Sequence, residues 1–231
     1  WVVICYVLTY SSLLLIFGKL GDLYGRRRVF LFTISTFLVG SLLCGAAQNM
    51  TQLIVFRALQ GFSGGALLPL SQTLLLRIFP GRQGIAIAVW SLTSSVAPVL
   101  GPLAGGWITD NISWPWIFYI NVPVGLLSAA LTWGIYRHRE TPTRKLPIDT
   151  VGLVLLVLWV GALQIMLDKG KDEDWFASPL IVTLTLVALI GFAAFLIWEF
   201  TEKHPIVDLG LFRLRNFSLG TLALCLGYAI F

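Results

Sequence analysis

The strongest constraint on how this chain can fold is a series of long apolar runs separated by short polar links. A helix that crosses a bilayer needs about 20 predominantly apolar residues, and most of the runs approach that length. They are too long and too continuous for the strands of a membrane barrel, which alternate in polarity over about 10 residues. The runs cover residues 1–17, 29–47, 52–76, 85–108, 117–136, 151–167 and 180–198, and an incomplete run covers 217–231.

Composition supports the same conclusion. Hydrophobic residues make up 57% of the 231-residue chain and charged residues only 12%. A soluble domain carries about 25% charged residues. One globular core cannot enclose this much apolar side chain, so we take lipid as the solvent around much of the chain. The sequence therefore predicts an all-α, polytopic membrane protein.

The placement of basic residues predicts the orientation of the spans. The chain has 16 Lys and Arg residues. If successive links alternate between the two sides of the membrane, one set of links holds all of them except Lys169 and Lys171, which lie in the other set, and Arg57, which lies within a span. By the positive-inside rule the basic links are cytoplasmic, and Trp1 lies near the outer face. The net charge of +5 then reflects topology, because the basic links contain no aromatic platform for a nucleic acid.

Several classes of function have no signature in the chain. His138 and His204 stand alone in links, and no His, Cys and Asp cluster has metal-ligand spacing. Cys5, Cys44 and Cys225 lie in apolar runs and are interpreted as small packing residues. The chain also has no glycine-rich phosphate loop after a strand and no Ser/His/Asp set. We therefore expect no enzyme activity, no metal or organic cofactor and no nucleic-acid partner.

The first polar link combines glycines, an acid and three arginines. Gly18 and Gly21 permit close approach of a neighbouring backbone, and Gly25 can adopt the positive φ that reverses the chain. Asp22 lies where the first helix ends, where its charge opposes the helix dipole, so it needs a cation or the N-terminus of another helix. The arginines at 26–28, taken alone, are ordinary cytoplasmic anchors. Their combination with Asp22 and the spaced glycines is harder to explain by topology alone.

This pattern, G-x-L-x-D-x-x-G-R-R-R, resembles motif A of the major facilitator superfamily, in the loop between the second and third helices. In that family the acid pairs with a basic residue and with the end of a helix from the second half, and this latch holds the cytoplasmic gate shut. The resemblance implies the same role here. The matching residues are Gly18, Leu20, Asp22, Gly25, Arg26 and Arg27.

A second pattern, R-x-x-Q-G, resembles the fourth-helix motif of the family. An Arg within a span is costly unless it faces a cavity or a partner. Arg57, Gln60, Gly64 and Ser71 share one helical face, which we predict to line the cavity. The alternative is that Arg57 extends to the outer interface, about two turns away. The residues implied in proton coupling or the cavity are Arg57, Gln60 and Gly61.

A third pattern resembles motif C, G-x-x-x-G-P-x-x-G-G, which marks antiporters in the family. Proline removes a backbone donor and kinks a helix, and the glycines allow another helix to pack tightly against the bend. Ala97 stands where the family has its first Gly, and Pro98 adds a second break. The motif covers Ala97, Gly101, Pro102, Gly105 and Gly106.

Two further segments identify a subfamily. Residues 116–125 resemble the W-I-F-x-I-N-x-P-x-G start of the sixth helix in EmrB/QacA-type drug:proton antiporters, although Pro115 replaces the basic residue often found before that Trp. Residues 204–217 resemble the segment before the second half of the same proteins. The runs 151–167 and 180–198 lie between them, as the two extra helices of fourteen-helix exporters do. The resemblance implies a fragment from the second helix to the start of the ninth, that is, an N-terminal bundle without its first helix plus two extra spans.

The resulting domain boundaries follow the links. Pro142, Pro147 and mixed charges predict an extended cytoplasmic connector, and Asp149 is interpreted as the N-cap of the next helix rather than as a proton carrier. Both chain ends fall inside apolar runs, so we expect a longer protein. The predicted units are 1–136 (N-terminal bundle), 137–149 (connector), 150–200 (two extra helices), 201–216 (cytoplasmic linker) and 217–231 (start of the C-terminal bundle).

The resemblance implies alternating access, in which a proton entering from outside drives a lipophilic, often cationic compound out of the cell. Asp22, Asp149, Asp168 and Glu199 all lie near span ends. We therefore expect the proton-carrying acid outside this sequence. Aromatic faces suit apolar cations. The remaining candidate cavity residues, with packing or lipid contact as the alternative for each, are Tyr6, Tyr10, Ser71, Trp90 and Trp159.

The leading hypothesis is a proton-coupled multidrug exporter in the inner (plasma) membrane, with a small molecule, protons and the bilayer as its partners. A periplasmic accessory protein is a further option, because some relatives work with one. One alternative is an antiporter for another solute, such as a metabolite, sugar or siderophore. Another is a non-transporting membrane scaffold, against which motif C argues, since a kinked, tightly packed helix suits a moving gate.

Overall fold

A computed structural model describes residues 1–137 and 149–230 of the chain. The described residues form helices and no strands, which confirms the predicted all-α class. His138 and nearly all of the predicted connector lie outside the described residues. The helices are α1 (Val2–Tyr24), α2 (Arg26–Gly45), α3 (Met50–Ile78), α4 (Gln83–Asn111), α5 (Trp116–Tyr119), α6 (Asn121–Tyr136), α7 (Thr150–Lys169), α8 (Pro179–Thr201) and α9 (Arg215–Ile230), with 3-10 helices η1 (Trp175–Ala177) and η2 (Leu209–Arg213).

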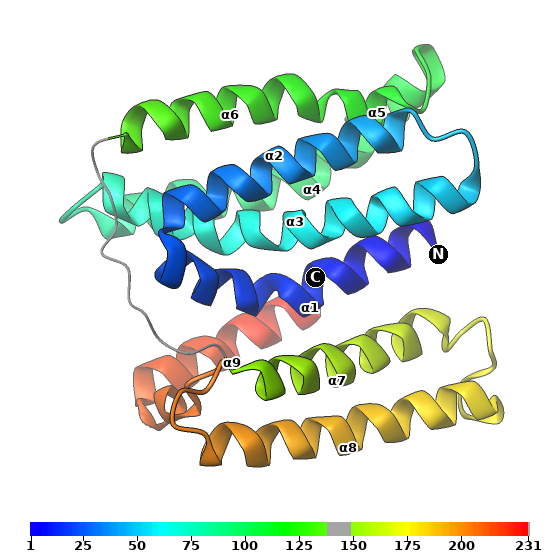
Figure 1. Cartoon of the computed structure of the whole chain (residues 1–231), viewed down its shortest axis with the longest axis vertical. Helices are drawn as coiled ribbons and strands as arrows, with labels where there is room; N and C mark the ends of the chain where they lie inside the picture. The colour runs from blue at the N-terminus through cyan, green and yellow to red at the C-terminus, as the bar shows by residue number, and fades with distance from the viewer. Residues whose placement is uncertain (138–148, 231) are drawn as a thin grey trace.

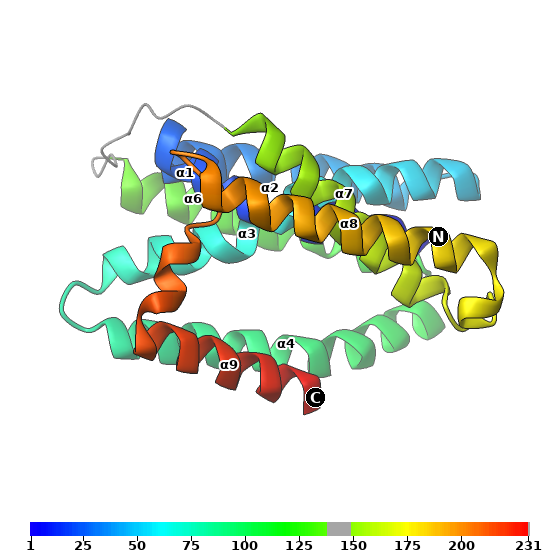
Figure 2. The ribbon, with the colours of Figure 1, turned by 90° about the horizontal axis from the view of Figure 1, so that it is seen from below.

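The helices form a central bundle with a pair beside it. Helices α1, α2, α3 and α6 run alongside one another, and the pair α7 and α8 packs against the bundle through α1 (Figure 1). Helices α4 and α9 stand apart from this layer in Figure 2; α4 contacts α3 and α5, and α9 contacts η2. The two predicted extra spans are thus a hairpin on the outside of the bundle.

The links between helices alternate between two ends of the molecule. The turns after α1 and α3 and the segment after α8 lie at one end, and the links after α2, α4 and α7 lie at the other (Figure 1). This is the alternation on which the assignment of basic links to one side depends. The basic links after α1, α3 and α8 therefore share one end of the structure.

Six described helical segments are long and apolar enough to cross a membrane, and α1 makes a seventh if its two parts, which meet at 50° between Leu14 and Ile16, form one span. Helices α5 and α6 count as one span, Trp116–Tyr136, interrupted at Ile120. The described part of α9 has 16 residues and stays below that length. The chain is thus a multi-pass membrane protein.

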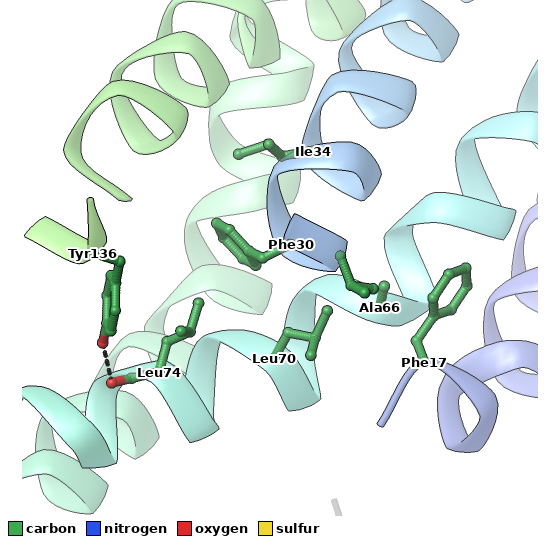
Figure 3. Close-up of a cluster of buried hydrophobic side chains, with 8 residues drawn as sticks. Phe17, Phe30, Ile34, Ala66, Leu70, Leu74 and Tyr136 are labelled. Carbon is green, nitrogen blue, oxygen red and sulfur yellow. Dashed lines mark hydrogen bonds between the residues drawn. The ribbon is translucent and has the colours of Figure 1, made fainter. Parts of the chain in front are cut away.

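A buried apolar cluster joins α1, α2, α3 and α6 near the end where α1 meets α2 (Figure 3). The hydroxyl of Tyr136 on α6 donates a hydrogen bond to the carbonyl oxygen of Leu74 on α3. In lipid, helices associate through van der Waals packing and interhelical hydrogen bonds, and this cluster supplies both. Its members are Phe17, Val29, Phe30, Ile34, Ala66, Leu70, Leu74 and Tyr136.

The first polar link is much shorter than the sequence predicts. The predicted link covers residues 18–28, but α1 continues to Tyr24 and α2 begins at Arg26, which leaves Gly25 alone between them. The reason is that polar side chains do not end a helix, whereas a residue that leaves the helical region does. Gly25 has a φ of 92°, which favours glycine. The residues of motif A before Gly25 therefore lie on a helix rather than in a loop.

Candidate functional site

The motif A residues on α1 differ in what they contact. Gly21 packs where no side chain would fit, because a Cβ there would lie 2.6 Å from Cδ2 of Leu70 on α3. Leu20 packs, partly buried, against the apolar cluster. No described residue outside its own helix lies within 4 Å of a Cβ position at Gly18. The predicted close approach is therefore found at Gly21 and not at Gly18.

Asp22 forms an ion pair across the turn at Gly25. Its Oδ1 accepts hydrogen bonds from Arg26, at 2.7 Å from Nη2 and 2.9 Å from Nε. The Asp22 side chain is 54% exposed, and an exposed pair contributes only about 0–1 kcal/mol to stability. The Asp22 carboxylate thus has a cationic partner close by in the sequence.

Arg27 joins the start of α2 to the end of α6. Its Nη1 donates hydrogen bonds of 3.1 Å to the carbonyl oxygens of Tyr136 and Arg137, and its guanidinium lies 4.6 Å from the ring centroid of Trp133. A cation beside the last carbonyls of a helix complements the helix dipole. Arg27 therefore caps α6 in addition to its place in motif A.

Arg57 lies among three elements of the bundle. Its guanidinium carbon is 4.5 Å from the ring centroid of Tyr6 on α1 and 5.4 Å from that of Phe118 on α5. Its Nη1 donates a 2.9 Å hydrogen bond to Oε1 of Gln60, one turn further along α3. Cation–π contacts and this hydrogen bond hold a charge inside a bundle that lipid would not solvate. These contacts direct Arg57 toward α1 and α5.

Gln60 extends this group into a buried polar network. Its Nε2 donates a 2.5 Å hydrogen bond to Oγ of Ser41 on α2, and Nδ2 of Asn121 on α6 donates to the same oxygen at 3.2 Å. Gln60 and Ser41 are 1% and 0% exposed. The network therefore links α2, α3 and α6 to the position of Arg57.

Ser41 and Asn121 were not predicted from the sequence as members of this network. Asn121 belongs to the W-I-F-x-I-N segment that identified the subfamily, and Ser41 is a polar residue within an apolar run. An isolated Ser in a span often donates to its own helix, so the residue type alone does not reveal an interhelical contact.

Two glycines of α3 beside the face predicted to line a cavity pack tightly against α1. A Cβ at Gly61 would collide with Thr9 and with the backbone of Tyr6, and one at Gly65 would lie 2.5 Å from the carbonyl oxygen of Tyr10. Gly64 lies beside the hydroxyl of Tyr6. Small residues spaced by four let two helix backbones approach closely. Gly61 is therefore a contact between α1 and α3.

Motif C lies on α4, which runs through Pro98 and Pro102 as one helix. A Cβ at Gly101, Gly105 or Gly106 would have no described residue within 4 Å apart from its own helix. Ala97 is also exposed. The packing of another helix against this face thus stays a prediction.

The remaining candidate cavity residues do not form one group. Tyr6 and Tyr10 stack on α1, with ring centroids 5.9 Å apart. Trp159 packs against Phe192 and Phe195, with centroids 4.9 and 6.2 Å apart, and so belongs to the contact between α7 and α8. Trp90 is half-buried on α4, and the hydroxyl of Ser71 donates to the carbonyl of Leu68 on its own helix.

Comparison with known proteins gives the family. The sequence profile of the Major Facilitator Superfamily matches residues 1–231. The chain belongs to this superfamily. Its motif order and all-α membrane fold agree with that membership, as the resemblance implied.

Curated relatives of this major facilitator chain place it nearer to one group. It is 47% identical to the multidrug export protein EmrB of Haemophilus influenzae, a match that covers the whole chain and 46% of that protein. It is 44% identical to EmrB of Escherichia coli K12, with 45% of that protein covered. It is 46% identical to the fatty acid resistance protein FarB of Neisseria gonorrhoeae, with 46% covered. The predicted EmrB-type subfamily is confirmed, and the chain spans about half the length of these relatives.

Proposed function

We propose that the whole protein is a proton-coupled exporter of lipophilic, often cationic compounds that works by alternating access in the plasma membrane. The observation that carries this proposal is the intramembrane Arg57, held by Tyr6, Phe118 and Gln60 within a chain whose EmrB relatives are named for multidrug export. A half-buried cation within an apolar span is costly, and a transport cycle would explain that cost.

Arg57 has a physical role in this proposal. A nearby positive charge favours the ionised form of a carboxylic acid. In the low dielectric of a membrane interior, that influence reaches further than it does in water. Arg57 would therefore set when a coupling acid releases its proton. We place that acid outside this sequence.

The gate in this proposal is the end of the bundle that holds the turn at Gly25. The pair between Asp22 and Arg26 is exposed and local, so it can be exchanged for a contact with another helix at little cost. Helix α4, with its uncovered glycines, offers the surface against which the second half would move. Both features support a moving structure more than a static scaffold.

The experiment is a dye-accumulation assay. Cells that express the complete protein should hold less ethidium than cells without it, and an uncoupler that removes the proton gradient should abolish the difference. Equal accumulation for every member of a panel of lipophilic cations would overturn the proposal. Reduced accumulation that survives the uncoupler would overturn the proton coupling alone.

A second substrate class, fatty acids, is favoured by the FarB relative, whose name refers to resistance to fatty acids. A carboxylate headgroup would complement the cationic Arg57, and an acyl chain would suit an apolar bundle. Accumulation of a radiolabelled fatty acid, measured beside ethidium in the same cells, separates the two classes. We propose the cation class first, because the EmrB matches are named for multidrug export.

A periplasmic accessory protein remains part of the proposal for the whole protein.

A further inference from the structure

The segment between α8 and η2 is fastened to the motif A helix. We call residues 202–208 the linker strap. Nζ of Lys19 on α1 donates hydrogen bonds to the carbonyl oxygens of His204 and Pro205, at 3.0 and 3.1 Å. Lys19 precedes Asp22 by one turn of the same helix. A residue inside motif A therefore holds a segment far away in the sequence.

The next residue of the linker strap makes an apolar contact. Ile206 lines a narrow gap together with Ile16, Leu20 and Leu23 of α1 and Leu153 of α7. The space left in this gap is about 10 Å³, no more than the minimum that a single water needs. The contact is thus packed and dry, and it joins the strap to both α1 and α7.

The residue after that is held from the other side. Glu199, near the end of α8, is only 4% exposed, and its Oε2 accepts a 3.0 Å hydrogen bond from the backbone N–H of Val207. Its Oε1 is buried and has no hydrogen-bond partner among the described residues. Trp198, the neighbour of Glu199, donates to Oδ1 of Asp149 at 3.0 Å, and Asp149 caps α7. The end of α8 is therefore itself fixed.

Residues 204–207 of the linker strap are all held, by contacts from α1, α7 and α8. The arrangement is therefore more than a single surface hydrogen bond from Lys19. Leu209–Arg213 and then α9 follow the linker strap directly. Any movement of α1 at its Gly25 end is thus transmitted to the segment that leads into α9. Burial of the Glu199 carboxyl has a cost that the backbone N–H groups of the linker strap offset only in part.

We propose that Lys19 and Glu199 are positioning residues of the transport cycle: they clamp the linker strap to the end of α1, so that the gate helix and the start of α9 move together. This proposal rests on the proposed function, because it assigns both residues to the gate of a transporter. Neither residue touches the substrate in it.

The first test removes the lysine donor in the complete protein. Lys19→Met keeps the apolar stem but cannot donate, and we expect the maximal export rate to fall about tenfold, because both hydrogen bonds from the charged ammonium are lost. KM for ethidium should stay unchanged, and Lys19→Arg should restore the rate. Lys203→Met is the matched control, because it removes an exposed cation of the linker strap whose Nζ, among the described residues, has no hydrogen bond or ion pair.

The second test measures the clamp without any substrate. In a chain whose native cysteines are replaced by Ser, Leu23→Cys and Ile206→Cys are joined by a short bismaleimide in membranes. The yield of the cross-linked product should fall when Lys19→Met is added to this background and should not fall when Lys203→Met is added. Cross-linked Lys19→Met should regain the wild-type rate. An unchanged yield in Lys19→Met overturns the proposal, and so does a full export rate in a variant whose yield has fallen.

The third test separates positioning by Glu199 from proton carriage. Glu199→Gln retains an oxygen that accepts from Val207, so we expect normal cross-linking and a nearly normal rate, whereas Glu199→Leu should lose both. A Glu199→Gln variant with normal cross-linking and no export would overturn the positioning role. If the wild type exports none of the compounds, the proposed function fails and the coupling to transport fails with it. The cross-linking yields would still decide whether the clamp exists.

Discussion

At the scale of single residues, the paired charges differ in what surrounds them. The Asp22–Arg26 pair is exposed and spans one turn, whereas Arg57 has its partners on three elements. Exposed local pairs contribute little to stability, so we expect the protein to fold without the Asp22 carboxylate. Its removal therefore tests function with little effect on folding.

We expect Asp22→Asn to lower the export rate about tenfold or more, because a neutral amide cannot make the charged contacts by which motif A is proposed to hold the gate shut, and 1.4 kcal/mol corresponds to a factor of ten. The amount of protein in the membrane should stay normal. The matched control is Asp172→Asn, which breaks another exposed local pair, with Lys169, between α7 and η1. Wild-type export by Asp22→Asn, measured by ethidium accumulation, would refute the gating role.

Ser41→Ala should destabilise the complete protein. It leaves the N–H donors of Gln60 and Asn121 without their shared acceptor in a buried site, at a cost of about 1–3 kcal/mol for each unsatisfied group. Ser35→Ala on the same helix is the control, because that hydroxyl is exposed and donates only to Leu31. Thermal unfolding in detergent measures the difference, and equal melting temperatures would contradict the network.

At the scale of helices, the sequence predicted the existence of the membrane spans better than the residues at which the helices end. Apolar length located the spans, because lipid requires it. The predicted end of α1, at residue 17, was too early. The helix continues through the polar residues after it as far as Tyr24, and it stops at Gly25, which has a positive φ. The packing face that Gly61 and Gly65 form against α1 was not predicted, because glycine spacing does not say which neighbour approaches.

Gly65→Ala tests that packing face. Its new Cβ would lie 2.5 Å from the carbonyl oxygen of Tyr10, a backbone atom that cannot rotate away. Overpacking of this kind costs about 1–3 kcal/mol. Gly134→Ala on α6, where no described residue outside its own helix lies within 4 Å, should be neutral or slightly stabilising. Equal melting temperatures for the two variants would mean that α1 and α3 are not in close contact.

At the scale of the whole molecule, the alternating links divide the surface into a basic end and an acidic end. Loops rich in Lys and Arg stay on the cytoplasmic side during insertion. The structure places the links in two groups that agree with this division (Figure 1). The orientation itself needs a membrane to be measured.

We expect Lys171→Cys to react with a membrane-impermeant maleimide in intact cells and Arg82→Cys to react only after the cells are opened. Both positions are exposed and lie at opposite ends of the structure. Cys5, Cys44 and Cys225 should be replaced by Ser beforehand. Labelling of Arg82→Cys in intact cells would reverse the assigned orientation.

Local chemistry was sufficient for the features that depend on a single segment. Apolar run length, the asymmetry of basic residues, the positive φ at Gly25 and the cap at Asp149 all follow from residue type and spacing. Each of these features is decided within a few turns of chain. The resemblance to the superfamily also rests on short motifs and was confirmed by the matched family profile.

Contacts between distant segments were decided only by the packing of the helices. Ser41, Gln60 and Asn121 share one network because α2, α3 and α6 meet there, and Lys19 reaches the linker strap because α1 lies beside α7 and the end of α8. Nothing in the residue types specifies those neighbours, since a hydrogen-bond donor accepts any suitable oxygen that the fold brings near. The sequence therefore defines the spans and their motifs, and the tertiary structure defines which side chains act together.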